Sequence, residues 1–358
     1  MKPINLGIGE PQHATPSVIT QALTENLHLL GKYPPTGGSP ELRQAVSAWI
    51  ARRYGIPAPD PDREVLPVAG TREALFAFAQ AVLEPSDPGV VLMPNPFYQI
   101  YEGAALMAGA EPFYVPTPSE SGFLPDWPSV PESTWSSVKL AYICSPGNPA
   151  GAVFGLEDWE VVFDLSDRYG FVIAADECYS EIYNGEPPVG ALEAASRLGR
   201  SNERIVSFNS LSKRSSAPGL RSGFVAGDPA IIARFLTYRT YHGAAPSSLT
   251  QVASVAGWTE ETHVLENREK YRAKFEAARD ILPNAPIPAG GFFLWLPVED
   301  DEEFSVKALS QAGLTILPGR YLARETNGSN PGKGYVRIAL VAELDVCIEA
   351  LNRLREIS

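Results

Sequence analysis

The sequence predicts an α/β protein with a large domain built on a mostly parallel sheet and a smaller α+β domain. Apolar, strand-like runs alternate with amphipathic helical segments through most of the chain, which is the pattern of βαβ units. Several of these runs are almost continuously apolar, as strands covered on both faces are. At 358 residues the chain is also longer than one compact core usually holds, which favours two domains.

The predicted large domain contains six apolar runs, each followed by polar, Gly-rich or helical sequence. We predict strands at Val65–Ala69, Gly89–Met93, Lys139–Cys144, Phe171–Ala175, Arg204–Phe208 and Ser222–Ala226. Apolar residues at helical spacing predict helices at Thr71–Leu83, Leu156–Tyr169, Pro229–Tyr238 and about Glu260–Ile281.

The pattern changes after the last of these helices. Shorter strand-like segments predict a partly antiparallel unit at Gly290–Pro297, Thr315–Pro318 and Gly334–Val341, closed by a helix from Glu343 onward. We therefore place the large domain at residues 26–275 and the small domain at residues 1–25 and 276–358.

Composition excludes several classes of protein. A net charge of −13 and a pI near 4.9 disfavour nucleic acid and anionic membranes as partners. No apolar run approaches the ~18 residues of a membrane span, and the segment MKPINLGIGEP lacks the apolar stretch of a secretion signal. Three widely spaced cysteines and four histidines without ligand spacing predict neither disulfides nor a metal site. We expect a cytoplasmic protein.

Ligands of open α/β sheets bind beyond the carboxyl ends of the strands, so the loops there are informative. The first is Gly70-Thr71-Arg72, where a strand ends and a helix begins. Free N–H groups and the helix dipole make this turn a candidate anion site, although for the turn taken alone a plain helix cap is the preferred explanation.

Two further loops carry polar groups of another kind. Asn148 lies in SPGNPAG, where prolines and glycines fix an irregular path, and a rigid turn is the simpler interpretation. Asp176 ends an apolar strand, so its carboxylate is expected to be buried and to need a cationic partner such as a protonated pyridine nitrogen. The alternative is that Asp176 only caps a helix.

The fourth loop holds Ser210, Ser212 and Lys213, with Arg221 shortly after. A lysine at a strand end can form a Schiff base when burial and positive neighbours lower the pKa of its amine. The four loops together supply an amine, an acid, an amide and phosphate-binding groups, which are the parts of a pyridoxal 5'-phosphate site.

Ordered motifs extend this interpretation to nearly the whole chain. They are INLGIGEP, GTREAL, PNPFY, SPGNPAG, ADECY, SLSKR, GLRSG and YVRIAL. In this order they resemble the fold type I aminotransferases of class I/II, which are pyridoxal-phosphate enzymes. The resemblance implies the fold of that family, a large domain with a mostly parallel sheet and a small α+β domain.

The resemblance also implies a role for each matching residue. Lys213 would carry the cofactor and move the substrate proton, and Asp176 would keep the pyridine nitrogen protonated. Asn148 and Tyr179 would bind the phenolic oxygen, and Tyr98 would stack on the ring. The phosphate would be held by Gly70, Thr71, Arg72, Ser210, Ser212 and Arg221.

Substrate and partner contacts follow from the same resemblance. Arg337 would bind the substrate α-carboxylate, with Gly9 and Asn148 beside the substrate. Tyr33 matches a tyrosine that reaches the cofactor of the neighbouring subunit, which implies a homodimer with shared active sites.

Within this family the segments PNPFYQIYEGAALMAGAEP, DECYSEIY, YRTYHG and LPGRYLARE are similar to succinyldiaminopimelate aminotransferases of bacterial lysine biosynthesis. Such enzymes use N-succinyl-diaminopimelate and 2-oxoglutarate, which both carry a distal carboxylate. One extra cation is therefore expected in the pocket, and Arg239, Arg72 and Lys32 are the candidates.

The sequence departs from the family at a few positions. Ala150 replaces a usual Thr, and Ser216 and Ala217 alter the residues after the lysine. Relatives usually have a longer arm before INLGIGEP, so dimer contacts and part of the substrate lid are expected to differ. Alternative functions are an aspartate- or aromatic-type aminotransferase, a carbon–sulfur β-lyase of the same fold, and a regulator built on this fold.

Overall fold

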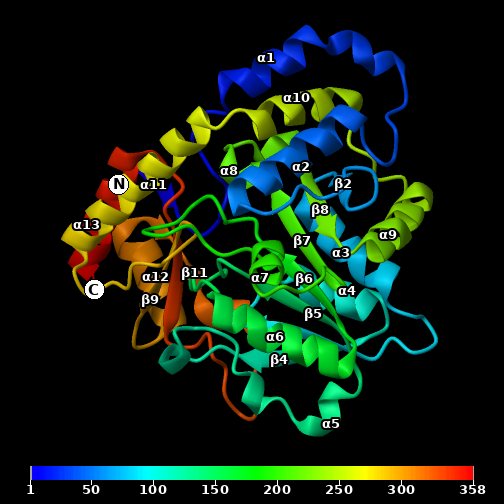
Figure 1. Cartoon of the computed structure of the whole chain (residues 1–358). Helices are drawn as coiled ribbons and strands as arrows, with labels where there is room; N and C mark the ends of the chain where they lie inside the picture. Colours follow the sequence, from blue (N-terminus) through cyan, green and yellow to red (C-terminus); the bar gives the residue numbers. More distant parts are fainter. Residues whose placement is uncertain (1, 358) are drawn as a thin grey trace.

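A seven-stranded sheet forms the centre of the protein in the computed structural model, which describes residues 2–357 (Figure 1). The strand order is β2-β8-β7-β6-β5-β3-β4, and only β8 runs antiparallel to its neighbours. The strands are β2 (Val65–Val68), β3 (Val90–Asn95), β4 (Glu111–Pro116), β5 (Val138–Cys144), β6 (Val172–Asp176), β7 (Ile205–Ser210) and β8 (Gly223–Gly227). The predicted mostly parallel α/β architecture is thus confirmed.

Helices cover both faces of this sheet. One face is covered by α2 (Pro40–Tyr54), α6 (Leu156–Tyr169) and α7 (Ala191–Arg197), and the other by α3 (Thr71–Val82), α4 (Ile100–Met107) and α9 (Pro229–His242). The remaining helices of this part are α1 (Ser17–Glu25), α5 (Glu132–Trp135), α8 (Leu211–Arg214), α10 (Ser248–Thr259) and the 3-10 turns η1 (Leu27–Gly31), η2 (Ser119–Ser121), η3 (Trp127–Ser129) and η4 (Pro218–Leu220).

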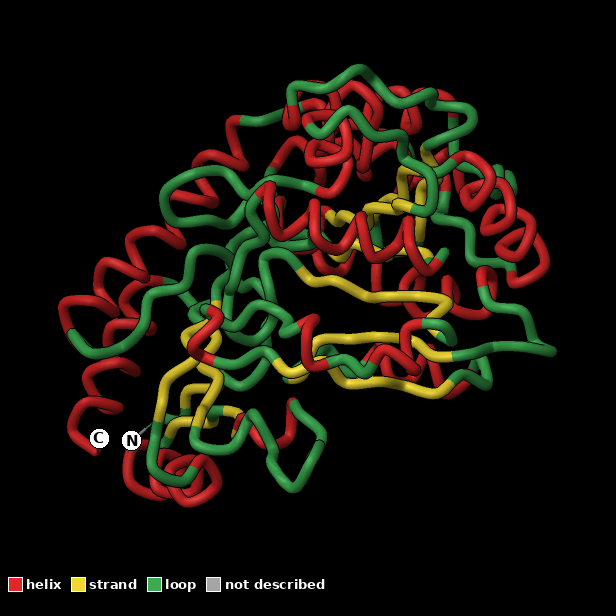
Figure 2. Tube along the Cα trace, turned by 60° about the horizontal axis from the view of Figure 1, so that its bottom comes forward, coloured by secondary structure: helices red, strands yellow, loops and turns green. Residues whose placement is uncertain are grey.

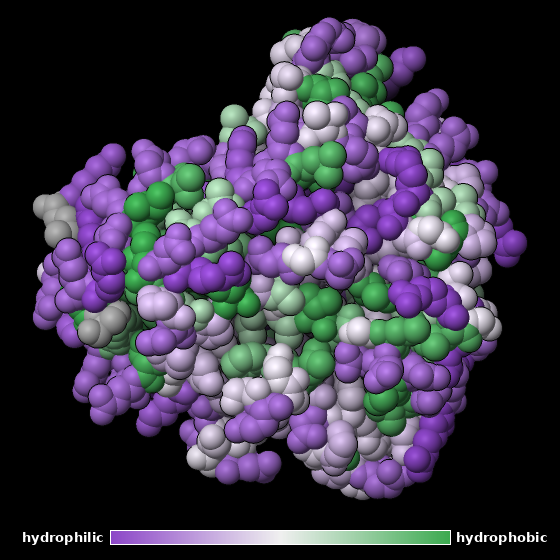
Figure 3. Space-filling model, turned by 60° about the vertical axis from the view of Figure 1, so that its left-hand side comes forward, coloured by the Kyte–Doolittle hydropathy of each residue, from purple (hydrophilic) through white to green (hydrophobic). Residues whose placement is uncertain are grey.

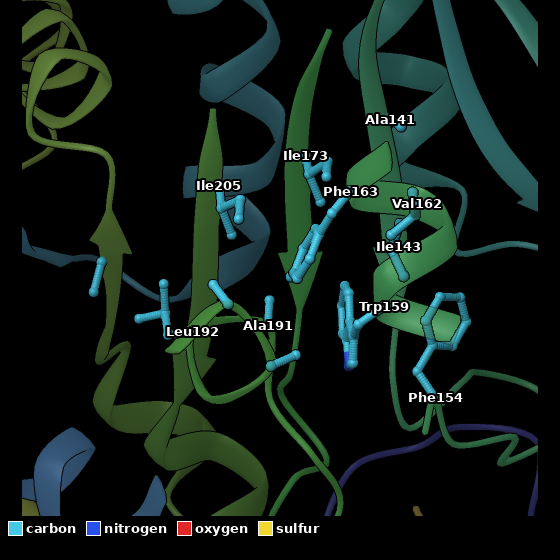
Figure 4. Close-up of a cluster of buried hydrophobic side chains, with 14 of the residues drawn as sticks. Ala141, Ile143, Phe154, Trp159, Val162, Phe163, Ile173, Ala191, Leu192 and Ile205 are labelled. Carbon is cyan, nitrogen blue, oxygen red and sulfur yellow. The ribbon is translucent and has the colours of Figure 1, made fainter. Parts of the chain in front are cut away.

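Alternating side chains explain why the strands are apolar throughout. In β5, Ala141 and Ile143 point into the core on one face, whereas Leu140 and Tyr142 point into the core on the other. Figure 4 shows the first of these cores, with Trp159 of α6 packed against the sheet. Burial of an aromatic side chain of this size contributes about 2–3 kcal/mol to stability. The sheet therefore has no polar face, as the continuous apolar runs predict.

Two smaller sheets lie apart from the large one (Figure 2). The strands β11 (Leu317–Pro318), β12 (Tyr335–Ala339) and β9 (Phe293–Pro297) form an antiparallel sheet in that order, and β1 (Ile4–Asn5) pairs in parallel with β10 (Leu314–Thr315). The helices that accompany them are α11 (Thr262–Ile281), α12 (Asp301–Ala312), α13 (Leu344–Ile357) and the turn η5 (Gly319–Leu322). They enclose a separate apolar core.

The observed elements match the predicted ones closely where the periodicity is strong. Each of the six predicted strands of the large sheet begins and ends within two residues of the bounds of an observed strand. The edge strand β4 was not predicted, because its sequence EPFYVP contains two prolines and a charge. Helices α1, α2, α4, α5, α7, α8, α10 and α12 were not predicted either. The predicted strand Thr315–Pro318 is divided between β10 and β11, which pair in different sheets.

The N-terminal segment contacts both parts of the chain. Strand β1 pairs with β10, whereas α1 packs on α10 through Ile19 and Ala253. At the other end of the predicted boundary, Phe275 and Ala278 of α11 belong to the core of the smaller sheets. The division into residues 26–275 and the remainder stays a prediction.

The surface is predominantly hydrophilic on the face shown in Figure 3, with separated hydrophobic patches. Within residues 2–357, none of the helices combines the length and apolar character needed to cross a bilayer. Over the same range, His, Cys, Asp and Glu side chains nowhere gather in threes to form a possible metal site.

Candidate functional site

The predicted site residues come together at the carboxyl ends of the large sheet. Gly70 follows β2, Asp176 ends β6, and Lys213 lies in the short helix α8 directly after β7. Asn148 lies in the loop after β5. Arg337 reaches the same place from β12 of the smaller sheet, since its side chain contacts Asn148.

An anion-binding cradle lies at the N-terminus of α3. Gly70 has φ +86°, and a Cβ at this position would overlap with Nη2 of Arg221. The absence of a side chain therefore lets the guanidinium lie directly against the first turn of a 12-residue helix. Positive charge beside free helix N–H groups suits a phosphate dianion.

Asp176 is a buried carboxylate without a charged donor. It accepts hydrogen bonds from the Tyr101 hydroxyl at 2.7 Å and from the N–H of Cys178 at 3.3 Å, and neither donor carries positive charge. Burial raises the pKa of Asp176 above its ordinary value. A protonated pyridine nitrogen would supply the missing cation. Tyr101 is not among the predicted site residues, because its only signal in the sequence is its position three residues after Tyr98.

Lys213 has the environment of a reactive amine. Its Nζ donates to the Gly9 carbonyl and lies 5.1 Å from the ring centre of Phe292. Burial is the main cause that lowers the pKa of Lys213 to about 8; the charges of Arg337 and Arg72 act in the same direction, whereas Cys178 and Glu10 oppose the shift. A sizeable fraction of the amine is therefore neutral near physiological pH, as attack on an aldehyde requires.

Arg337 is a buried cation without an acidic partner. Its Nη1 donates to Oδ1 of Asn148 and its Nη2 to the Gly7 carbonyl, both at 2.9 Å. Its guanidinium lies 4.3 Å from the ring centre of Phe293, and its buried Nε has no hydrogen-bond partner within the described chain. Burying an unneutralised charge is costly, so this arrangement favours an anionic ligand such as a carboxylate.

Aromatic side chains border the space between these groups. Tyr98 accepts a 2.8 Å hydrogen bond from Nε of Arg72, and its ring meets Tyr101 edge to face. The buried ring of Tyr179 packs against Phe292 and a neighbouring phenylalanine. The predicted stacking role of Tyr98 and the hydrogen-bonding role of Tyr179 remain predictions.

The other predicted residues differ in how they are placed. Oγ of Ser210 accepts the N–H of Ser212 at 3.0 Å and so caps α8. Thr71 Oγ1 lies 3.0 Å from the thiol of Cys178, which joins the cradle to the Asp176 loop. Tyr33 is 100% exposed. A residue that contacts a second subunit would be exposed in this way in the structure of a single chain.

These groups fit pyridoxal 5'-phosphate. The cradle at Gly70 and Arg221 matches its phosphate, the uncompensated carboxylate of Asp176 matches its ring nitrogen, and Lys213 matches its aldehyde. Asn148, held by Arg337, offers its amide to the same space.

The cradle makes a specific prediction for Gly70→Ala. The added methyl group would displace the Arg221 guanidinium, so we expect the Kd for pyridoxal phosphate to rise about 10-fold or more, as loss of a charged hydrogen bond does. Equilibrium titration of cofactor absorbance measures this change. Gly55→Ala is the matched control, because Gly55 also has positive φ but a methyl group there would meet no other atom within 4 Å. It should cost about 1 kcal/mol of stability and leave affinity unchanged, and equal Kd values for the two variants would contradict the cradle.

Comparison with known proteins agrees with this site. The family model for aminotransferase class I and II matches residues 1–353. An LL-diaminopimelate aminotransferase from Desulforudis audaxviator (strain MP104C) is 32% identical over 363 residues, which cover 98% of this chain and 89% of that protein. An aminotransferase structure from Neisseria meningitidis Z2491 superposes with a TM-score of 0.96 at 52% identity, covering 99% and 92% of the two chains. The structure of a probable N-succinyldiaminopimelate aminotransferase from Thermus thermophilus has a TM-score of 0.89 at 29% identity, covering 100% and 95%.

Proposed function

Since the chain belongs to the class I and II aminotransferases, which depend on pyridoxal phosphate, we propose that it transfers the amino group of N-succinyl-LL-diaminopimelate to 2-oxoglutarate in lysine biosynthesis. The family supports the reaction type. The choice of substrate is supported by the motifs shared with succinyldiaminopimelate aminotransferases and by similarity to the Thermus protein of that printed name.

One observation carries the proposal of an amino-acid substrate, and it is the buried guanidinium of Arg337. Asn148 and Gly7 orient it through neutral acceptors, which leave its positive charge and its Nε–H available. A carboxylate bound there would place the neighbouring Cα toward the Lys213 side of the site. The planar guanidinium of arginine can bind a carboxylate through two parallel hydrogen bonds, which the ammonium group of lysine cannot do.

The roles of the other residues follow from their surroundings. When bound, pyridoxal phosphate supplies an electron-withdrawing ring that stabilises negative charge at the substrate Cα. Asp176 would hold a proton on the ring nitrogen by its buried negative charge. Nζ of Lys213 would take the proton from the substrate Cα and return it to the cofactor carbon on the other side of the amino nitrogen, for which a pKa of about 8 is well matched to neutral pH.

The distal carboxylate of the substrate needs a further cation, and the surroundings of the three candidates differ. Arg239 is fully buried, and its guanidinium is paired with Glu73 and the Ala244 carbonyl. Arg72 and Lys32 are exposed, and Arg72 also borders the site through Tyr98. We therefore propose that Arg72 binds the distal carboxylate, in place of the phosphate contact expected from the sequence.

A second substrate is LL-diaminopimelate itself, which the printed names of several curated relatives suggest. Its distal end carries an ammonium group as well as a carboxylate. Glu10 is exposed, and its charge acts on Lys213, so it would attract such an ammonium. The two substrates thus differ in the charge that the entrance of the site must accept.

We also propose that the protein acts as a homodimer with shared active sites. The fully exposed ring of Tyr33 and the exposed side chains of Leu27 and Leu30 lie in one short segment, and burial of such apolar side chains favours association. Tyr33 would then reach the cofactor phosphate of the second subunit.

A panel of amino donors with 2-oxoglutarate tests the substrate. We expect kcat/KM for N-succinyl-LL-diaminopimelate to exceed that for LL-diaminopimelate by about 10-fold or more, because Arg72 attracts its extra negative charge. The reverse order would favour LL-diaminopimelate. Glutamate alone should convert bound cofactor to its pyridoxamine form, and steady release of pyruvate from cystathionine without that conversion would indicate a β-lyase instead.

A further inference from the structure

A chain of buried hydrogen bonds behind Lys213 has no part in the proposed reaction. Nζ of Lys274 lies 2.7 Å from Nε2 of His13, and Nδ1 of His13 lies 3.0 Å from Oδ1 of Asn267. The amide nitrogen of Asn267 then donates to the carbonyls of Lys213 at 3.1 Å and Arg214 at 3.2 Å. His13, Asn267 and Lys274 are 5%, 7% and 1% exposed, so solvent does not compete for these bonds.

Only one arrangement of protons satisfies this relay. The ammonium of Lys274 can only donate, so Nε2 of His13 accepts and its Nδ1 carries the hydrogen. That hydrogen is donated to Asn267, whose amide nitrogen is left to face the two carbonyls. Burial lowers the pKa of His13, and the charge of Lys274 lowers it further, which keeps the imidazole neutral. Burial also lowers the pKa of Lys274 to about 8.

The relay joins the two sides of the site. His13 lies four residues after Gly9, whose carbonyl accepts the Lys213 amine, and six after Gly7, whose carbonyl accepts Arg337. Asn267 and Lys274 lie on one face of α11, at positions two turns apart. The relay thereby fixes the N-terminal segment and the backbone of Lys213 to the same helix.

Stability alone does not account for such a cluster. The ammonium of Lys274 lies 4.7 Å from the ring centre of Tyr271, but its hydrogen-bond partners are only the neutral His13 and the Leu340 carbonyl. Burying such a charge is costly, and apolar residues of similar volume would pack at least as well. Glu343 and Lys270 are the charged groups whose fields act on both His13 and Lys274, and Cys347 acts on Lys274, but no ion pair within residues 2–357 neutralises Lys274.

We propose that the His13–Asn267–Lys274 relay is a positioning device that fixes the backbone of Lys213 relative to Gly9 and so sets how the lysine amine meets the cofactor. This inference rests on the proposed role of Lys213. Thr15 Oγ1 also donates to the Ser216 carbonyl, so without the relay the Gly9 segment and the Lys213 backbone would be joined less firmly rather than separated, and water would reach the amine more readily.

The test is a pH titration of the visible absorbance of the cofactor-loaded protein. His13→Phe keeps an aromatic ring but removes both nitrogens, and we expect the midpoint of the titration to rise by about half a unit or more, because greater solvation favours the charged nitrogen. His13→Gln retains one acceptor and one donor, so it should restore the parental midpoint. Lys274→Met removes the donor at the other end of the relay and should shift the midpoint in the same direction as His13→Phe. It provides a second test if His13→Phe folds poorly.

Ser166→Ala is the control for a purely structural effect, because Ser166 donates a buried hydrogen bond to the Phe171 carbonyl in another part of the core. It should lower Tm without moving the midpoint. The inference is overturned if His13→Phe and Lys274→Met lower Tm as Ser166→Ala does and leave the midpoint unchanged. Lys213→Ala in the same titration checks the premise separately: if it kept the absorbance, the proposed role of Lys213 would itself be wrong.

Discussion

Lys213→Ala should yield a folded protein that lacks the near-visible absorbance of the lysine-bound cofactor and loses at least about 10³-fold in kcat. In the proposed mechanism the amine both binds the aldehyde covalently and serves as the base for the substrate Cα, and a positioned base alone contributes about 10²–10⁴-fold. Absorbance after cofactor addition and single-turnover kinetics measure the two losses. An unchanged spectrum would contradict the assignment.

Lys274→Met is the matched control for this variant. Lys274 is also buried, and burial lowers its pKa to about 8, the same value as for Lys213. A lowered pKa therefore does not distinguish the two lysines, whereas their surroundings do, since Lys274 is enclosed by His13 and the Leu340 carbonyl. The variant should keep the absorbance, although with the shifted midpoint described above. Loss of the absorbance in Lys274→Met alone would reverse the assignment.

Asp176→Ala should lower kcat by about 10²–10³-fold or more while leaving the cofactor-free protein at least as stable as the parent. Without Asp176 the ring nitrogen is no longer held protonated, so negative charge at Cα is less stabilised. Burial raises the pKa of Asp176 in the folded chain, so the folded state binds its proton more tightly than the unfolded state. This carboxylate therefore destabilises the cofactor-free fold increasingly as pH rises above about 4.

Denaturant unfolding of the cofactor-free proteins across pH, combined with steady-state kinetics, tests both parts. Removal of Asp176 should increase relative stability toward neutral pH, and bound cofactor should stabilise the variant less than the parent. Glu177→Gln is the control, because Glu177 is the adjacent buried carboxylate but binds Tyr54 and the N–H of Ala191. It should change stability with little effect on kcat. Residues 177–190 form no helix that Asp176 could cap, so equal activity of Asp176→Ala and the parent would show instead that its carboxylate has only a structural role.

Local periodicity predicted the central sheet because a strand buried on both faces has a sequence that few other elements have. β5 and β6 were located this way, and the polar residues after them, Asn148 and Asp176, could be identified as a site before any contact was known. Periodicity did not reveal β4 and α2, whose sequences have weak or mixed patterns and whose positions are decided by packing. Element boundaries inside the predicted strand Thr315–Pro318 also depended on which strand each half pairs with.

Local periodicity could not predict interactions between residues that are far apart in the sequence. Arg337 meets Asn148 across 189 positions, and the charge of the candidate Arg239 proved to be neutralised by Glu73. The hydrogen bond of Tyr101 to Asp176 and the contact of His13 with Lys274 likewise join elements that show no mutual signal in the sequence.

The sequence by itself therefore determined the α/β class, the order of the strand-end loops and the candidate site residues that they carry, including Lys213. Those features depend on the alternation of apolar and polar residues and on turn-forming residues, both of which are local properties of short sequence segments. Only the tertiary structure decided which charges are neutralised, as for Arg239, and which are left for ligands, as for Arg337. The physical reason is that burial follows from local pattern, but the partner of a buried polar group is set by the packing of segments far apart in the sequence.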